Sequence, residues 1–344
     1  MSFSNSLIQW YLQNKRDLPW RNSTDAYTIW LSEIILQQTR VAQGLPYFEA
    51  FINQFPSVFD LANAPEEQVL KLWQGLGYYS RARNLHNTAK HVVTHYNGVF
   101  PKSYNQLLKL KGIGTYTAAA IASFSNQEPV AVLDGNVYRV LARYFNIQND
   151  ISASPTKKIF QELAQKVLPP EKASVHNQAI MEFGALQCVP KNPNCAVCVF
   201  SSSCGALQHK LVDKLPVKTK KTKVNNRFLS YLIFIDSQNK TLVNQRTEKG
   251  IWQNLYEFPL FETNIKATEQ EIIAYINTLN YKVVDVSVLN LFTVIHKLSH
   301  QKLHIQFIEV KLEDILANAI SITNLKKLPF PIVIHNFIER FFTK

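Results

Sequence analysis

The chain has 344 residues, of which 46% are hydrophobic and 18% are charged, and its formal net charge is +12. This composition excludes a disordered polyelectrolyte, and 10 glycines and 15 prolines without a period exclude collagen-like and low-complexity chains. The length predicts two or three domains, and the basic charge favours a polyanionic partner such as nucleic acid.

Residues 3–207 have apolar positions at helical spacing, for example at 7–12, 29–36 and 107–110. Ser103 and Asp134 stand directly before such segments, where we expect them to act as N-caps. No apolar stretch approaches the roughly 18 residues of a membrane-spanning helix, and no signal peptide is recognisable. We therefore predict an all-α domain over residues 1–207, in a cytoplasmic protein.

A basic segment at 208–227 interrupts this pattern and is expected to be an exposed linker. Beyond it, strands are predicted at 228–235, 241–245, 281–288 and 304–310, and helices at 269–278 and 332–342. Residues 228–344 are therefore expected to form a smaller α+β domain.

Four cysteines lie close together in the chain: Cys188, Cys195, Cys198 and Cys204. In a reducing compartment such a group indicates a metal site, and four thiolates suit zinc or an iron–sulfur cube. A zinc ribbon usually has two C-x-x-C pairs, whereas only Cys195 and Cys198 form one here. The spacing favours an iron–sulfur cluster, and four unligated cysteines are the alternative.

Residues 110–121 predict a helix, a tight turn with Gly112 and Gly114, and a second helix. Glycines let backbone N–H groups approach an anion closely, and the second helix adds its positive N-terminus. This pattern is typical of a helix-hairpin-helix phosphate site, and an ordinary turn is the alternative.

Two carboxylates stand out by their surroundings. Glu33 lies among large apolar residues, where desolvation raises a carboxyl pKa toward that of a general acid. Asp134 begins a helix whose dipole should keep it ionised. Such a pair suits cleavage of a glycosidic bond, with one acid for the leaving group and one carboxylate for the oxocarbenium-like sugar. The alternatives are a solvated helix position for Glu33 and a simple N-cap for Asp134.

Together with segments 18–21, 30–41, 75–84 and 133–140, these motifs resemble the adenine DNA glycosylases of the MutY type, in the helix-hairpin-helix superfamily. The resemblance implies hydrolysis of adenine mispaired with 8-oxoguanine or guanine in duplex DNA, and one 4Fe-4S cluster on the four cysteines. It assigns protonation of adenine to Glu33, stabilisation of the sugar cation to Asp134, and orientation of that site to Asn136.

The same resemblance implies DNA contacts, for which packing is the alternative role. The residues that enter or line the duplex would be Gln38, Thr39, Leu76, Gly77 and Tyr78. The flipped adenine would lie among Trp20, Arg21 and Gln178.

Tyr116 separates close relatives, because enzymes of the endonuclease III type have a lysine there that attacks the sugar and cuts the strand. A tyrosine cannot form that Schiff base. The sequence therefore predicts a monofunctional glycosylase in which Tyr116 positions Glu33 or Asp134.

The C-terminal domain resembles the Nudix-like fold with which this family inspects the base opposite adenine, and it lacks the residues for nucleotide hydrolysis. The family's Phe-Ser-His loop is Leu298, Ser299 and His300 here, so Ser299 and His300 are expected to bind the oxidised guanine. We expect a monomer. The alternatives are a pyrimidine-lesion glycosylase and lyase, which Tyr116 opposes, and a non-catalytic DNA binder or zinc-ribbon regulator, which Glu33 and Asp134 oppose.

Overall fold

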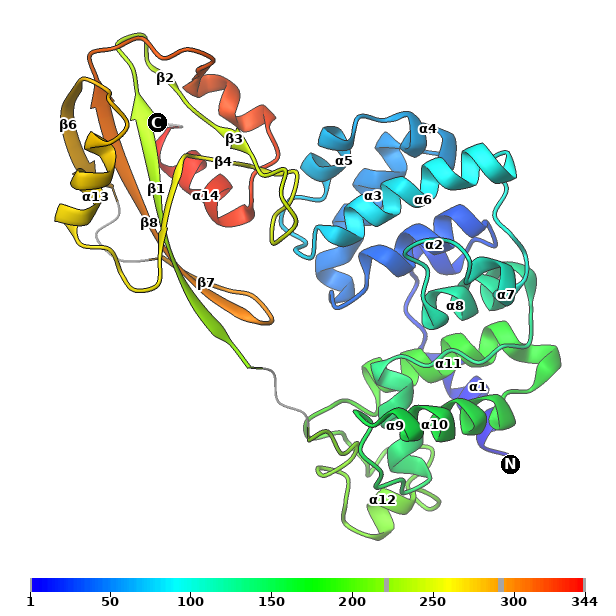
Figure 1. The fold of residues 1–344 in the computed structure, drawn as a ribbon. Helices are drawn as coiled ribbons and strands as arrows, with labels where there is room; N and C mark the ends of the chain where they lie inside the picture. The colour runs from blue at the N-terminus through cyan, green and yellow to red at the C-terminus, as the bar shows by residue number, and fades with distance from the viewer. Residues whose placement is uncertain (1, 220–222, 290–293, 343–344) are drawn as a thin grey trace. The chain divides into compact units, whose positions relative to one another are not determined.

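The computed structural model describes residues 2–219, 223–289 and 294–342 (Figure 1). Contacts divide the chain into two compact units, Met1–Asn63 with Asn84–Lys220, and Ala64–Arg83 with Lys221–Lys344. The segment Ala64–Arg83, expected in the helical domain, therefore groups by its contacts with the C-terminal residues. The domain borders at 207 and 228 stay predictions.

The expected all-α character of the N-terminal region is confirmed, since the described residues up to 219 contain no strand. The helices are α1 (Phe3–Asn14), α2 (Ala26–Ile35), α3 (Val41–Gln54), α4 (Val58–Asn63), α5 (Glu66–Leu72), α6 (Ser80–Tyr96), α7 (Tyr104–Leu107), α8 (Thr115–Asn126), α9 (Gly135–Tyr144), α10 (Ser154–Val167), α11 (Ala173–Leu186) and α12 (Gly205–Gln208), with 3-10 turns at Pro19–Arg21 and Pro170–Lys172.

Helices α2, α8 and α11 are buried on most of their faces. Residues 27 and 29–35 of α2 and residues 117–124 of α8 are buried, and these two helices pack against each other. Helix α11 packs on both α1 and α9. A helix buried all round needs good caps for its free N–H groups, and Asp25 supplies one for α2 by accepting from the Thr28 N–H at 2.8 Å.

The predicted turn and second helix within 110–121 are confirmed, while the first helix, α7, ends earlier, at Leu107. Gly112 has φ +84°, and a Cβ there would lie 2.9 Å from Cβ of Asn84, so only glycine fits the turn. Gly114 is the N-cap of α8, with open space beside it. Ser103 does stand at the N-cap of α7, but its hydroxyl donates to Gln106 instead of capping the backbone.

The second unit is built on a mixed sheet of order β5-β1-β8-β6, with β7 also paired to β8. Strands β1 and β8 are parallel, and the other pairs are antiparallel. The elements are β1 (Asn225–Ile235), β2 (Lys240–Thr241), β3 (Asn244–Gln245), β4 (Tyr256–Glu257), β5 (Leu260–Thr263), α13 (Glu269–Asn277), β6 (Val283–Val288), β7 (Val294–Lys297), β8 (Gln301–Leu312), β9 (Ile320–Ser321), the 3-10 turn Ile322–Lys327 and α14 (Ile332–Phe341).

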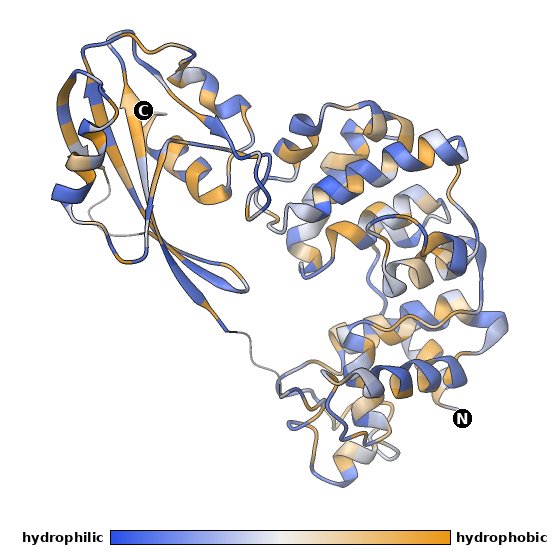
Figure 2. Ribbon diagram, in the orientation of Figure 1, coloured by the Kyte–Doolittle hydropathy of each residue, from blue (hydrophilic) through white to orange (hydrophobic). Residues whose placement is uncertain are grey.

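Alternate residues of β1 and β8 face opposite sides of the sheet, and both sides are covered. Phe234 and Ile308 pack with Ile272 of α13. On the other side the ring of Phe307 stacks on Phe337 of α14 at 3.9 Å. The apolar centres of β1 and β8 are visible in Figure 2.

The predicted strands and helices are largely confirmed, with two differences. The expected strand at 241–245 is two short strands, β2 and β3, which pair with β9 and β4 in separate sheets. Asp236 accepts the backbone N–H groups of Gln238 and Lys240 and makes the turn that precedes β2. Strand β1 begins at Asn225, inside the expected linker, where it pairs with Gln301. Residues 220–222 of that linker lie outside the described residues. In the parts of the chain that are described, no helix has the length and hydropathy needed to cross a membrane.

We predict that His176 makes the helical unit less stable in acid. This side chain is 2% exposed, and burial lowers its pKa to about 4. Between pH 6.5 and 4 the unfolded state binds the proton and the folded state does not, so stability falls as the pH falls, by about 3 kcal/mol at most. Urea unfolding at pH 7 and pH 4 should show that His176→Gln flattens this dependence.

The matched control is His95→Gln, at an exposed position of α6. It should leave the pH dependence of unfolding as it is in the wild type. Equal pH dependence of wild type and His176→Gln would contradict the assignment.

Candidate active site

A cavity of about 160 Å³ opens in the helical unit, and eight of the residues singled out in the sequence line it. They come from the Pro19–Arg21 turn, the end of α2 and beyond, and α8, α9 and α11. These residues are Trp20, Arg21, Glu33, Thr39, Tyr116, Asp134, Asn136 and Gln178. The fold therefore gathers side chains that are up to 158 positions apart into one site.

Glu33 is 6% exposed on α2. The Tyr116 hydroxyl donates to its Oε2 at 2.6 Å. Burial raises the pKa of Glu33 to about 7; the hydrogen bond from Tyr116 opposes this rise, and the nearby charge of Asp134 adds to it. At neutral pH this carboxyl group is therefore about half protonated, as a general acid requires.

Asp134 is the N-cap of α9, where its carboxylate accepts from the Val137 N–H at 2.8 Å and from the Asn136 amide at 2.8 Å. The N-cap prediction is thus confirmed. The helix dipole was expected to keep this carboxyl group ionised. Burial acts in the other direction: it raises the pKa of Asp134 and outweighs these hydrogen bonds. The pKa values of both carboxyl groups are therefore raised. They differ in their hydrogen bonds, since Asp134 accepts two from N–H groups and Glu33 accepts one from a hydroxyl.

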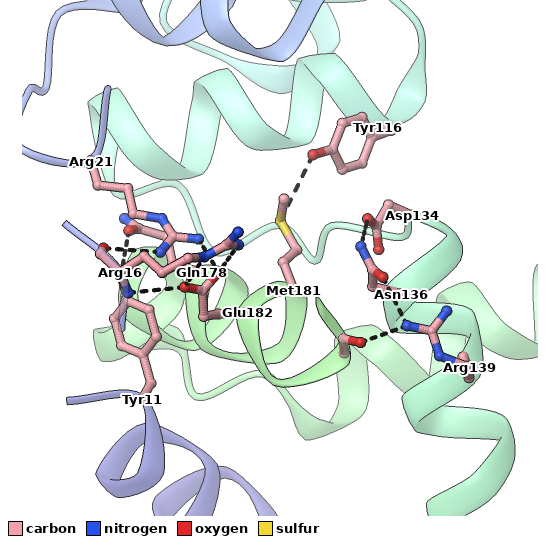
Figure 3. Close-up of polar contacts among 11 residues, drawn as sticks. Tyr11, Arg16, Arg21, Tyr116, Asp134, Asn136, Arg139, Gln178, Met181 and Glu182 are labelled. Carbon is pink, nitrogen blue, oxygen red and sulfur yellow. Dashed lines mark hydrogen bonds and ion pairs between the residues drawn. The ribbon is translucent and has the colours of Figure 1, made fainter. Parts of the chain in front are cut away.

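Asn136 is held by a chain of hydrogen bonds that ends at the cysteine loop, and Figure 3 shows its first part, from Asp134 through Asn136 to Arg139. The guanidinium of Arg139 donates to Oδ1 of Asn136 at 2.9 Å, to the Gly184 carbonyl at 2.6 Å and to the Cys188 carbonyl at 2.7 Å. Gly184 also lets α11 approach α9 closely, since a Cβ there would lie 2.6 Å from Cβ of Asn136. Arg139 was not among the residues singled out in the sequence.

The opposite wall contains a buried charge cluster that was also missed. The Glu182 carboxylate has no exposed surface and binds Arg16 and Arg21, each at 2.6 Å. Burial opposes its ionisation, but the hydrogen bonds from Arg16 and Arg21 outweigh that effect and lower its pKa to about 2. The signal was available, because Glu182 interrupts an apolar helical run as Glu33 does. Figure 3 shows this cluster beside Gln178, whose Oε1 accepts from the Tyr11 hydroxyl at 2.8 Å.

Trp20 lines the cavity and also packs edge-on against Phe48, with ring centroids 5.0 Å apart. Its expected role near the base and the packing alternative are thus compatible. Gln38 is exposed and has φ +57°, and Tyr78 is 49% exposed with φ +49°. A positive φ is rare for such side chains and is often found at functional sites.

The other residues expected to contact DNA differ in exposure. Leu76 is 6% exposed, so it is buried in this state, and Gly77 has φ +73° with open space beside it. Ser299 and His300 are exposed at the turn between β7 and β8. Within the second unit the Tyr78 hydroxyl and the Ser299 hydroxyl are hydrogen-bonded. The DNA roles of these residues stay predictions.

The four cysteines line a second cavity, together with aromatic side chains. In the described residues, no three His, Cys, Asp or Glu side chains converge tightly enough to hold a single metal ion. Arg143 is 3% exposed, and its guanidinium contacts carbonyl groups and the Sγ of Cys188 at 3.4 Å. A buried cation needs a nearby negative charge, which thiolates around a cluster would supply.

Comparison with known proteins agrees with this architecture. Residues 31–170 match the family model of the HhH-GPD superfamily base excision DNA repair proteins, and residues 230–340 match that of the NUDIX domain. A thermostable thymine-DNA glycosylase has a similar structure, with a TM-score of 0.56 and 28% identity over 60% of this chain and 95% of that one. A trapped endonuclease III–DNA covalent intermediate, at 20% identity and a TM-score of 0.53 over 60% of this chain and 95% of that one, shares the fold.

Two relatives match this chain over different fractions of its length. The adenine DNA glycosylase of Buchnera aphidicola subsp. Schizaphis graminum is 38% identical over 88% of this chain and 86% of its own length. The adenine DNA glycosylase of Homo sapiens is 42% identical over 60% of this chain and 40% of its own length. The chain matches both family models and is 38% identical to an adenine DNA glycosylase over 88% of its length. It therefore belongs to the adenine DNA glycosylase family of base-excision repair proteins.

Proposed function

We propose that this protein hydrolyses the N-glycosidic bond of adenine that is mispaired with 8-oxoguanine or guanine in duplex DNA. One observation carries the proposal: Glu33, a carboxyl group with a pKa of about 7, lies in the same cavity as Asp134, a carboxylate that accepts hydrogen bonds from two N–H groups. Cleavage of a glycosidic bond requires a carboxylic acid that protonates the leaving group and a carboxylate that stabilises the sugar cation, both in one cavity.

The cavity fits a base that has been flipped out of the duplex. An enzyme that acts on a base must first take it out of the stack, at a cost of a few kcal/mol. Trp20 offers an aromatic face, and Gln178 and Arg21 offer polar groups for a purine edge. The positive φ of Gln38 and Tyr78 supports their assignment to the residues that enter the duplex and offset this cost.

Glu33 is the proposed general acid. Protonation of a ring nitrogen lets adenine leave as a neutral base rather than as an anion, which lowers the main barrier. Tyr116 acts as a positioning residue, because its hydroxyl donates to Glu33 and fixes the direction of that carboxyl group.

Asp134 is the proposed stabiliser of the sugar cation. It is buried, and its remaining negative charge is kept by the Val137 N–H and by Asn136. In a site with little water, a fixed carboxylate stabilises an oxocarbenium-like centre strongly. The chain from Asn136 through Arg139 to the Cys188 carbonyl keeps this carboxylate in place.

Cys188, Cys195, Cys198 and Cys204 are proposed to hold one 4Fe-4S cluster. All four line one cavity, and four thiolates are a ligand set for such a cluster. The buried guanidinium of Arg143 fits the negative charge of such a group. Adenine hydrolysis transfers no electron, so we assign the cluster a structural role.

The Nudix-like domain is proposed to read the base opposite adenine, in a monomeric enzyme. Ser299 and His300 lie exposed at the turn of a hairpin, and Tyr78 contacts Ser299 in the same compact unit. Hydrogen-bond donors at this place can distinguish an oxidised guanine from other bases.

The substrate assignment predicts adenine loss from duplexes with 8-oxoguanine or guanine opposite it, and none opposite thymine. Because Tyr116 cannot form a Schiff base, strand breaks should be visible only after alkali treatment. The measurement is single-turnover cleavage of labelled duplexes with and without alkali. Glu33→Gln should lower the cleavage rate by about 10³-fold, since an amide cannot protonate the base, while duplex affinity stays within about twofold.

The raised pKa of Glu33 predicts how the rate of base removal falls at alkaline pH. The acid form is required, so the single-turnover rate should fall about tenfold per pH unit above pH 7. Because the hydrogen bond from Tyr116 lowers this pKa, Tyr116→Phe should move this fall to higher pH. A rate that rises continuously to pH 9, or a fall that Tyr116→Phe leaves in place, would contradict the assignment of Glu33.

The cluster assignment predicts about four iron atoms per chain in protein purified without oxygen, with the broad visible absorption of iron–sulfur proteins. Cys198→Ser should lower iron content and thermal stability together. The control is Ser203→Ala in the same loop, which should keep both. Stoichiometric zinc in place of iron would defeat the assignment.

A further inference from the structure

A third cavity, of about 440 Å³, lies in the helical unit next to the catalytic cavity. Arg16, Arg21 and Gln178 line both cavities, so one layer of side chains separates them. Figure 3 shows these three residues together with Tyr11, on the side away from Tyr116 and Asp134. We call this space the rear cavity.

The two halves of the separating layer differ in strength. Arg16 and Arg21 are fixed by charge-assisted bonds to the buried carboxylate of Glu182. Gln178 is held by two hydrogen bonds between neutral groups: its Oε1 accepts from the Tyr11 hydroxyl at 2.8 Å, and its amide donates to the Ser174 hydroxyl at 3.4 Å. Neutral hydrogen bonds are the weaker class, so the layer is easiest to open at Gln178.

The rear cavity suits a neutral, planar and polar molecule. With Arg16 and Arg21 neutralised in part by Glu182, its other charged residues are two of each sign: Lys15, Lys172, Asp17 and Glu171. An aromatic ring, a hydroxyl group and three side-chain amides complete its polar lining, from Tyr11, Ser174, Asn22, Gln127 and Gln178. Counting Glu182 against the two arginines, the set carries one net positive charge, so it offers stacking and hydrogen bonds with little charge for a nucleotide phosphate.

The proposed reaction produces a molecule of this class in the adjoining space. Free adenine is formed inside the catalytic cavity while its former sugar, still part of the DNA strand, remains at the entrance. As long as the abasic duplex stays bound, that entrance is covered. An exit on the side of Gln178 would let the base leave first.

We propose that the rear cavity binds free adenine transiently and releases it to solvent, with the Gln178 side chain as the movable part of the separating layer. This inference rests on the proposed function. It requires no further chemistry, because the base is already neutral and detached when it passes.

The test blocks the rear cavity away from the catalytic residues. Leu12 lines it, is 59% exposed and lies on α1, so Leu12→Trp narrows the exit without disturbing the core. Val175→Trp on α11 is a second variant at the same cavity. Leu186→Trp is the matched control, on the same helix at an exposed position that lines neither cavity.

Three rates are measured with enzyme in excess over a duplex that contains tritiated adenine. Alkali cleavage gives bond breakage, rapid filtration gives the release of free base, and fluorescence anisotropy with a competitor gives dissociation of the duplex. The wild type should release adenine about tenfold faster than the duplex. Leu12→Trp and Val175→Trp should slow base release to the rate of duplex dissociation and leave bond breakage unchanged, and Leu186→Trp should change none of the rates.

Two results would overturn the proposal. In the first, adenine leaves the wild type only together with the duplex. In the second, both tryptophan variants break the bond and release the base as fast as the wild type. A wild-type enzyme that breaks no bond would instead defeat the proposed function, and the exit with it.

Discussion

A carboxyl group stays protonated at neutral pH only if water is kept away from it, and in this chain buried helices do so around Glu33. The cost of charging this group in the interior raises its pKa to about 7. The same exclusion of water makes every other polar group in the cavity dependent on a partner. Tyr116, Asp134, Asn136 and Glu182 all have one.

Because desolvation raises the pKa of Asp134 in the same cavity as well, it cannot by itself explain the different roles proposed for the two carboxylates. Their local hydrogen bonds support that difference. Glu33 accepts one hydrogen bond from a phenol, which only partly offsets the effect of burial on its pKa, whereas Asp134 accepts from a backbone N–H at a helix N-terminus and from a side-chain amide. A single helix, α9, thus fixes the direction of the carboxylate and supports its charge.

The sequence was sufficient for the all-α region, the α13 and α14 helices and most of the candidate cavity, because these depend on apolar spacing and on motifs local in the chain. It was insufficient where distant segments decide. The pKa direction of Asp134 follows from burial by neighbouring helices, and the Arg139 chain depends on how closely α9 and α11 pack. The grouping of Ala64–Arg83 with C-terminal residues likewise rests on contacts between distant parts of the chain. Glu182 is different, since its apolar surroundings in the sequence were a readable signal.

Gly184 sets the spacing between two helices that carry different parts of the site. With no side chain of its own, it leaves just enough room for Asn136, and its carbonyl accepts from Arg139. A single added methyl group would displace Asn136, and through their hydrogen bond Asp134, from the positions that they have in this site. The spacing of α9 and α11 beside the cavity therefore depends on a residue to which no chemical role is assigned. A genetic screen for inactive enzymes should recover substitutions of Gly184 as well as substitutions of Glu33 and Asp134.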